Sequence, residues 1–383
     1  MARTTATTPQ HVGPQARTTA GRVPGAGRAP HRPVRAALAG MVLVSLALVS
    51  ACSSPPAPEA PDPVTVTPTI DDNRGNPPEP VVPVVWPLTG VPVEAVPERP
   101  AVSVKIENTS SVRPQSGLDQ ADVVWETIVE FEVSRFVAVF HSQVPEEVGP
   151  IRSVRPMDPA ITAPMRGLIA FSGGQPGILA MVDASASQPI SQDAGAGGMY
   201  RIRTRSAPHN VYGSVQAFID EADENHRASP AQQFAFAQRA DLATAPAGGT
   251  PAGSLAFRLS GQSSPSWAWD PTGGVWLRSE GSTPATAPSG AQLTSVNVVA
   301  VTANHPATGF GAQGGAAVPT YELVGEGPAT VATGGHVVEG TWRKGAEDAP
   351  MELVDAGGQP ILLAPGNTWV EMIPAGKGSL TVG

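Results

Sequence analysis

The stretch ADVVWETIVEFEVSRFVAVFH, residues 121–141, contains two runs of the side chains that β-strands prefer. The runs ADVVWETIV and SRFVAVFH are rich in β-branched and aromatic residues, which pack well on a pleated surface. Upstream, PAVSVKI at 100–106 alternates small apolar with polar residues and predicts another strand. This part of the chain is therefore expected to form a sheet.

Helical patterns follow these strands. The segments MDPAITAPMRG (157–167) and PGILAMVDAS (176–185) are typical of helices and enclose a buried strand, LIAFS. The segment 214–225 begins at Ser214, a suitable N-cap, and places apolar residues at helical spacing. The sequence SPAQ at 229–232 predicts a capping box that opens another short helix. Strands interleaved with helices predict an α/β domain over residues 86–242.

The composition changes after this predicted domain. The segment ATAPAGGTPAGS, residues 243–254, has the composition of a linker. Beyond it, apolar runs are short and bounded by Gly, Pro or Asn, as in β-sandwiches and β-barrels. We therefore expect a β-rich, sandwich- or barrel-like domain over residues 255–383. The expected fold class is mixed, α+β or α/β, with an N-terminal α/β domain and a β-rich C-terminal domain.

The chain has a single cysteine, Cys52, which directly follows an apolar run of about fourteen residues. Arginines precede that run, and the sequence VSAC at its end resembles the bacterial lipobox. The pattern predicts that residues 1–51 are a lipoprotein signal peptide and that Cys52 is lipidated. The run is shorter than the roughly twenty apolar residues that a spanning helix needs. Two or more acyl chains on Cys52 would provide stable anchoring.

Residues 52–85 are dense in proline and predict a lipid-anchored, disordered spacer. Residues 1–51 contain six arginines and no acid, so their removal takes the formal charge from −9 to about −15. Such an acidic protein is a poor candidate for binding nucleic acid. We therefore expect a protein on the extracytoplasmic face of the cell membrane, held there by its lipid, with an envelope or cell-wall ligand as its possible partner. The sequence does not indicate the oligomeric state.

Several longer segments resemble one family. RPAVSVKIENTSSVRPQSGLDQADVVWE, EVGPIRSVRP, PHNVY, GTWRK and PGNTWVEMIP are similar to parts of the YerB-like lipoproteins, bacterial envelope proteins of unknown function. The resemblance covers most of residues 86–240 and returns in patches over 292–374. It implies a lipoprotein with an N-terminal and a C-terminal part, and it implies no particular reaction. It is also what recommends Glu107 and Asn108, at the end of a predicted strand, as site residues.

The segment LIAFSGGQPGILAMV predicts a strand, a glycine turn and a helix. Ser172, within AFSGG, lies in a loose variant of the G-x-S-x-G nucleophile elbow, where a strained turn exposes a serine. Alternatively, the turn at Gly173 and Gly174 could present free N–H groups to an anion at the start of the helix. A third interpretation is a tight turn that needs glycine only for its backbone angles.

The segment GPIRSVRPMDP contains Arg152, Arg155 and Asp158. Because the planar guanidinium group suits carboxylates and phosphates, the two arginines could clamp an anionic ligand. The alternative is that they neutralise buried acids of the protein itself. Glu126 and Glu130 fall on one face of a predicted strand and would be costly to bury without partners.

His209 lies shortly before a predicted helix, without the spacing of a metal motif. We therefore expect neither a metal ion nor a cofactor. In the C-terminal part, Trp342, Arg343 and Trp369 suggest a surface that stacks on sugars. The alternative is that these tryptophans pack in the core.

Taken together, these patterns predict a non-enzymatic binding protein for a polar or anionic ligand from the cell envelope. The candidate ligand-binding residues are Arg152, Arg155, Asp158, Gly173, Gly174, Glu107, Asn108 and His209. One alternative is a cell-wall hydrolase or transferase that uses Ser172 or Glu126 as its catalytic residue. Another is a structural lipoprotein in which these polar residues serve the fold.

Overall fold

The computed structural model describes residues 82–312 and 314–383, which all belong to one compact unit. The larger of its two main sheets has eleven strands: β1 (Val102–Glu107), β2 (Val123–Ile128), β3 (Ser134–Phe140), β4 (Leu168–Phe171), β5 (Gln188–Ser191), β8 (Thr250–Pro251), β14 (Asn297–Ala303), β17 (Gly325–Thr333), β18 (His336–Lys344), β19 (Glu352–Val354) and β20 (Thr368–Pro374). Their order is β19-β18-β17-β14-β20-β2-β3-β1-β4-β5, and β8 pairs with β18.

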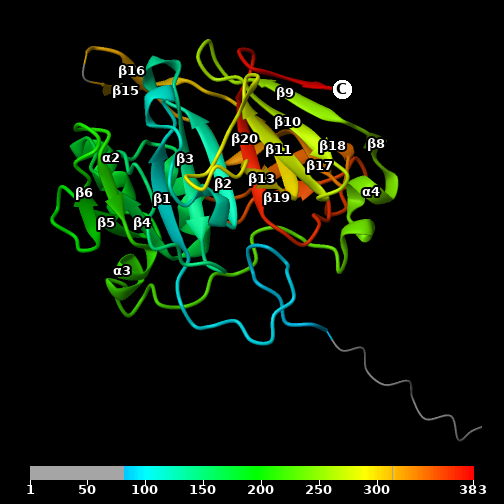
Figure 1. The fold of residues 1–383 in the computed structure, drawn as a ribbon, viewed down its shortest axis with the longest axis horizontal. Helices are drawn as coiled ribbons and strands as arrows, with labels where there is room; N and C mark the ends of the chain where they lie inside the picture. Colours follow the sequence, from blue (N-terminus) through cyan, green and yellow to red (C-terminus); the bar gives the residue numbers. More distant parts are fainter. Residues whose placement is uncertain (1–81, 313) are drawn as a thin grey trace, which may run out of the picture. The chain divides into compact units, whose positions relative to one another are not determined.

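This sheet runs through both predicted parts of the chain. Strand β2 pairs in parallel with β20, so that Trp125 lies opposite Val370. Figure 1 shows β20 in red beside β2 in cyan. Every residue of β1, β2, β3 and β20 is buried, as expected for central strands covered on both faces. The N-terminal and C-terminal parts therefore share one continuous sheet.

The second sheet has six strands: β9 (Ser254–Arg258), β10 (Pro265–Asp270), β11 (Val275–Glu280), β12 (Thr283–Pro284), β13 (Thr294–Ser295) and β21 (Ser379–Val382). It packs against the larger sheet through tryptophans, since Trp267 and Trp276 share one apolar core with Trp369. The rings of Trp267 and Trp369 lie 5.3 Å apart, edge to face. The structure is thus strand-rich with several sheets, which agrees with the β-rich part of the expected mixed fold class.

The remaining regular elements are short. Two hairpins are formed by β6 (Met199–Arg201) with β7 (Val211–Gly213) and by β15 (Ala307–Gly311) with β16 (Ala317–Pro319). The α-helices of the described residues are α1 (Asp158–Thr162), α2 (Pro176–Asp183), α3 (Val215–Asp220) and α4 (Thr244–Gly248). None of them is long and apolar enough to cross a membrane.

The structure confirms the predicted N-cap and corrects a predicted helix. The Ser214 side chain accepts a hydrogen bond from the Ala217 N–H at the start of α3. Residues 229–232 form no helix, because their capping groups have other partners: Ser229 donates to Pro97 O and Gln232 to Phe234 O. The segment 243–254, predicted as a linker, contains α4 and β8.

The predicted strand that would carry both Glu126 and Glu130 ends earlier than expected. Strand β2 stops at Ile128, and Glu130–Glu132 form a 3₁₀ turn, η3, with Phe131 in the left-handed region at φ 60°. Glu126 and Glu130 therefore do not share a strand face, as the alternating pattern had predicted. The turn points Glu130 toward a different set of partners from those of Glu126.

Candidate functional site

A cavity of about 650 Å³ lies where the end of β1 meets the start of β3 and the loop that follows β4. Six of the candidate residues line it: Glu107, Arg152, Arg155, Ser172, Gly174 and His209. We call it the arginine cavity, because Arg135 from β3 also lines it beside the two predicted arginines. The volume lies within the range of small-molecule sites, roughly 300–1,000 Å³.

An extended segment brings these residues together. The Arg152 N–H donates to Lys105 O in β1 (2.8 Å), and Arg152 O accepts from the Ser172 N–H (3.1 Å). The Val154 N–H donates to Gly173 O (3.1 Å). Residues 152–154 thus lie between the ends of β1 and β4, which places Arg152 against the glycine turn.

Arg155 is an internal partner of Glu130. Its Nε donates to Glu130 Oε2 at 2.6 Å, its Nη2 donates to Oε1, and its Nη1 donates to Val154 O at 2.7 Å. Both side chains are buried, and burial lowers the pKa of Arg155 to about 10. For this arginine the structure shows the internal ion pair that the sequence left as an alternative.

Arg135 and Arg152 keep more of their donors available. Arg135 donates to Ser153 O at 2.9 Å, and its other contact, to Glu130 Oε1, is long at 3.4 Å. Arg152 donates to Pro208 O at 2.8 Å, while its Nε lies 3.6 Å from Glu107 Oε2. Burial and then the charge of Arg152 lower the pKa of Arg135 to about 10. An anion bound between the two guanidinium groups would offset this repulsion.

Glu107 holds His209 at the edge of the cavity. His209 Nδ1 lies 2.9 Å from both carboxylate oxygens of Glu107, so this nitrogen carries a proton toward the acid. The His209 side chain is 40% exposed, whereas that of Glu107 is 3% exposed. The pair fixes the imidazole ring and leaves its far side accessible.

The glycine turn has the predicted strand–turn–helix order, but not the strain of a nucleophile elbow. Ser172 does not have a positive φ, and its backbone N–H and C=O are bonded to Arg152 and Asp193. Among the described residues, no hydrogen bond joins its hydroxyl to His209. The geometry therefore does not indicate an activated serine. A Cβ at Gly173 would lie 1.9 Å from Oδ2 of the exposed Asp193 side chain, which would have to move aside.

Asp158 and Asn108 do not line the arginine cavity. Asp158 is fully buried, where Oδ1 accepts from Lys105 Nζ at 2.6 Å and Oδ2 accepts from the Arg155 N–H at 2.7 Å. Burial is the main cause that lowers the pKa of Lys105, to about 8. Asn108 instead lines a second pocket of about 360 Å³.

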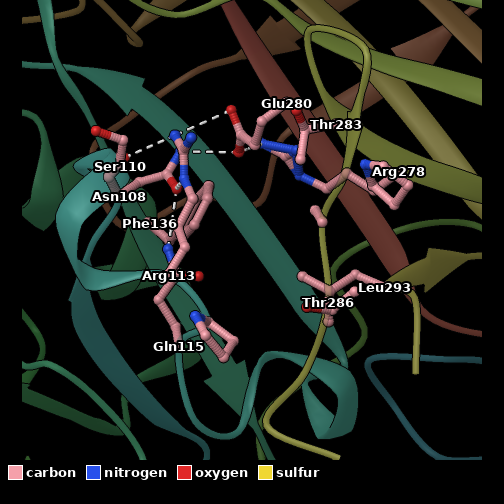
Figure 2. Close-up of a pocket in the computed structure, with 13 residues that line it drawn as sticks. Asn108, Ser110, Arg113, Gln115, Phe136, Arg278, Glu280, Thr283, Thr286 and Leu293 are labelled. Carbon is pink, nitrogen blue, oxygen red and sulfur yellow. Dashed lines mark hydrogen bonds and ion pairs between the residues drawn. The ribbon is translucent and has the colours of Figure 1, made fainter. Parts of the chain in front are cut away.

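Figure 2 shows this second pocket between the segment that carries Asn108 and Arg113 and the loop that carries Thr283 and Thr286. Arg113 bridges the two sides, since its Nη2 lies 3.0 Å from Glu280 Oε2 and its Nε donates to Asn108 Oδ1 at 3.0 Å. An ion pair of the protein itself thus joins the two sides of the pocket.

Glu126 lies behind this pocket in a fully buried cluster. Its Oε2 accepts from Arg278 Nη2 at 2.5 Å, and its Oε1 accepts from Ser263 at 3.1 Å. Arg278 also contacts Glu280 at 2.9 Å and lies over the Trp369 ring. Glu126 lines neither cavity, so its position does not support a catalytic role.

The tryptophans proposed for sugar stacking belong to the interior. Trp342 is 2% exposed and donates to Thr302 O, and Trp369 is 1% exposed. Arg343 is an exposed partner of Glu326. Trp342 and Trp369 therefore pack in the core and do not form a surface that could stack on sugars.

The residues of the arginine cavity that sequence reasoning did not assign to a site include Arg135, Phe131 and Asp193. Arg135 lies opposite Glu107 in the β1–β3 register, and that register is not readable from one sequence. Phe131 lies within the run VEFEV, where apolar and polar residues continue to alternate, so the pattern predicted a strand and gave no sign of the turn.

Cys52, the signal peptide 1–51 and the spacer up to residue 81 lie outside the described residues. Within the described ranges, no group of three or more His, Cys, Asp or Glu side chains could hold a metal ion.

A family model described as the N-terminal domain of a protein of unknown function, DUF3048, matches residues 88–228, and the C-terminal domain of the same description matches 255–370. A Bacillus subtilis protein named "Putative lipoprotein YerB" is 36% identical over 140 residues, which are 36% of this chain and 42% of that relative. The match thus spans less than half of the relative's length. A crystal structure of the YerB protein from Bacillus subtilis has the same fold, with a TM-score of 0.66 and 24% identity over 78% of this chain and 99% of that chain. The chain therefore belongs to the YerB-like family of unknown function, with DUF3048 N-terminal and C-terminal domains.

Proposed function

We propose that this protein is a lipid-anchored binding protein of the cell envelope, and that its arginine cavity holds a polar, anionic ligand. Cys52 is the lipidated residue, and the proline-rich segment after it carries the folded unit away from the extracytoplasmic face of the membrane. The lipobox-like sequence supports this placement, and so does the similarity to a relative named as a lipoprotein.

One observation carries the binding proposal. Arg135 and Arg152 converge on one cavity while Arg155 is already neutralised by Glu130. The ion pairs of Arg135 with Glu130 and of Arg152 with Glu107 are long, at 3.4 Å and 3.6 Å. The two like charges therefore still repel each other, and an anion between them would relieve that repulsion. The cavity therefore suits a carboxylate or phosphate group.

Titration with inorganic phosphate and D-lactate, followed by amide chemical shifts in NMR spectra, tests this proposal. We expect both anions to change the amide chemical shifts of residues 152–154 and 172–174. The substitution Arg152→Ala should weaken the binding of both anions at least tenfold. Arg343→Ala removes an exposed arginine elsewhere and serves as the matched control. Equal binding by wild type and Arg152→Ala, or no binding of any anion, would contradict the proposal.

The anchor is tested separately with Cys52→Ala. We expect the wild-type protein to incorporate an alkyne-labelled fatty acid and to sediment with membranes. The variant should lose the label and leave the membrane fraction. Labelling that persists in Cys52→Ala would show that another residue carries the lipid.

A further inference from the structure

Phe131 lies in an unusual place for a large apolar side chain. It lines the arginine cavity, its residue is 55% exposed, and its backbone is left-handed at φ 60° and ψ 22°. Glu132, the next residue, is also left-handed at φ 59°. Two consecutive left-handed residues that are not glycine are rare, because the Cβ of each crowds its own backbone.

A loop of the C-terminal part holds this turn in place. Ser260 Oγ donates to Glu132 O at 2.5 Å, and Gln262 Nε2 donates to Phe131 O at 3.0 Å. The Gly261 N–H donates to Glu132 Oε2 at 3.2 Å. Backbone strain persists where surrounding contacts over-determine it, and such places cluster at ligand sites. Burial does not explain the strain here, because more than half of Phe131 faces solvent.

The rest of the cavity complements an aromatic platform. Arg135 and Arg152 offer donors for an acidic group, while the exposed carboxylate of Asp193 and the accessible side of the His209 ring offer polar partners for hydroxyl groups. An exposed aromatic face beside carboxylates and arginines matches a sugar ring, which has apolar C–H faces and hydroxyl edges.

From this arrangement, and resting on the proposed function above, we propose that the ligand is an acidic sugar. Its pyranose ring stacks on Phe131, its carboxylate or phosphate lies between Arg135 and Arg152, and its hydroxyls donate to the Asp193 carboxylate. Phe131 then determines specificity for the ring, while the arginines determine specificity for the charge.

Four probes separate these contributions in calorimetric titrations of the intact protein. N-acetylmuramic acid combines a ring with a carboxylate, and glucose 6-phosphate combines a ring with a phosphate. N-acetylglucosamine is the ring without the acid, and D-lactate is the acid without the ring. We expect at least one acidic sugar to bind more tightly than either part alone. The acidic sugar that binds more tightly identifies the acidic group.

The variants Phe131→Ala and Phe131→Trp test the platform. We expect Phe131→Ala to weaken binding of the acidic sugar about tenfold, leaving D-lactate unchanged, and Phe131→Trp to keep the affinity. The melting temperature of Phe131→Gly should equal or exceed that of wild type, since glycine relieves the strain; a large decrease would show that Phe131 serves the fold instead.

If D-lactate and phosphate bind but the acidic sugars bind no better, or bind Phe131→Ala equally well, the sugar inference is overturned and the anion site stands. If no anion binds at all, the proposed function itself fails.

Discussion

Arg152 and Arg155 stand three residues apart, but their guanidinium groups meet different partners. Arg155 forms a bidentate ion pair with buried Glu130. The Arg152 side chain is 18% exposed, and its Nε lies 3.6 Å from Glu107 Oε2. Removing one member of a buried pair leaves an uncompensated charge in the interior. The two arginines should therefore differ in what they do for stability.

We expect Arg155→Ala to lower the free energy of unfolding by about 3–5 kcal/mol. Arg152→Ala should lower it by less than about 1 kcal/mol, because its ion pair is longer and Arg152 is partly exposed. Urea unfolding of both variants and wild type, followed by tryptophan fluorescence, measures the difference. Equal losses would mean that Arg152 belongs to the same structural network and would weaken its assignment to a binding site.

The buried cluster of Glu126 and Arg278 also contains Glu371, whose protonation affects the stability of the fold. Glu371 is fully buried, and Trp267 Nε1 donates to its Oε1 at 3.0 Å. Burial, followed by the charge of Glu126, raises the pKa of Glu371 well above 4.5. Glu371 is therefore protonated in the folded protein over a pH range in which it is ionised in the unfolded chain.

This difference predicts a pH-dependent effect of Glu371→Gln. Below about pH 4 residue 371 is neutral in both states of both proteins, so their stabilities should change in parallel. Above that pH, Glu371 ionises only in the unfolded wild-type chain, which favours unfolding. The variant should become progressively more stable than wild type as the pH rises from 4.5 through the folded-state pKa.

Urea midpoints of the two proteins between pH 4 and pH 8 check this expectation. A constant difference across that range, or one that shrinks as the pH rises, would show that Glu371 is ionised in the folded protein.

At the scale of elements, the sequence predicts those strands and helices that depend on short-range patterns along the chain. The strands β1 to β4 and the helices α2 and α3 follow from residue type and from spacing over a few positions. Pairing was not predictable, because one sequence does not say which strand lies beside which. Only the structure therefore shows that Arg135 lies opposite Glu107 and that Arg278 pairs with Glu126. The turn that contains Phe131 was likewise found only in the structure.

The end of the short 3₁₀ turn η4 (Ala163–Met165) carries another strained residue. Arg166 is left-handed at φ 49°, and its side chain makes an exposed ion pair with Asp348. Glycine adopts this conformation without strain, and exposed pairs contribute little to stability. We expect Arg166→Gly to raise the free energy of unfolding by about 0.5–1 kcal/mol.

Arg166→Ala is the control, because it removes the same ion pair but keeps the Cβ that causes the strain. It should be no more stable than wild type. If both variants change the urea midpoint equally, strain at this position does not limit stability.

At the scale of the whole molecule, the two family domains are joined by more than a connecting segment. Strand β2 from the first pairs with β20, which begins at the end of the second, and Glu126 from the first is paired with Arg278 from the second inside the core. Neither side can separate without exposing strand edges and leaving a buried charge unpaired.

We therefore predict that a chain beginning at residue 82 unfolds in one cooperative transition, with equal calorimetric and van't Hoff enthalpies. Arg278→Met, which leaves Glu126 unpaired, should lower the melting temperature of that single transition. Hydrogen exchange should then speed up equally in β1 to β3 and in β14 and β17, although the substituted residue lies in β11. Two calorimetric transitions, or faster exchange confined to the C-terminal strands, would show that the two parts unfold independently and that the shared sheet adds little to their stability.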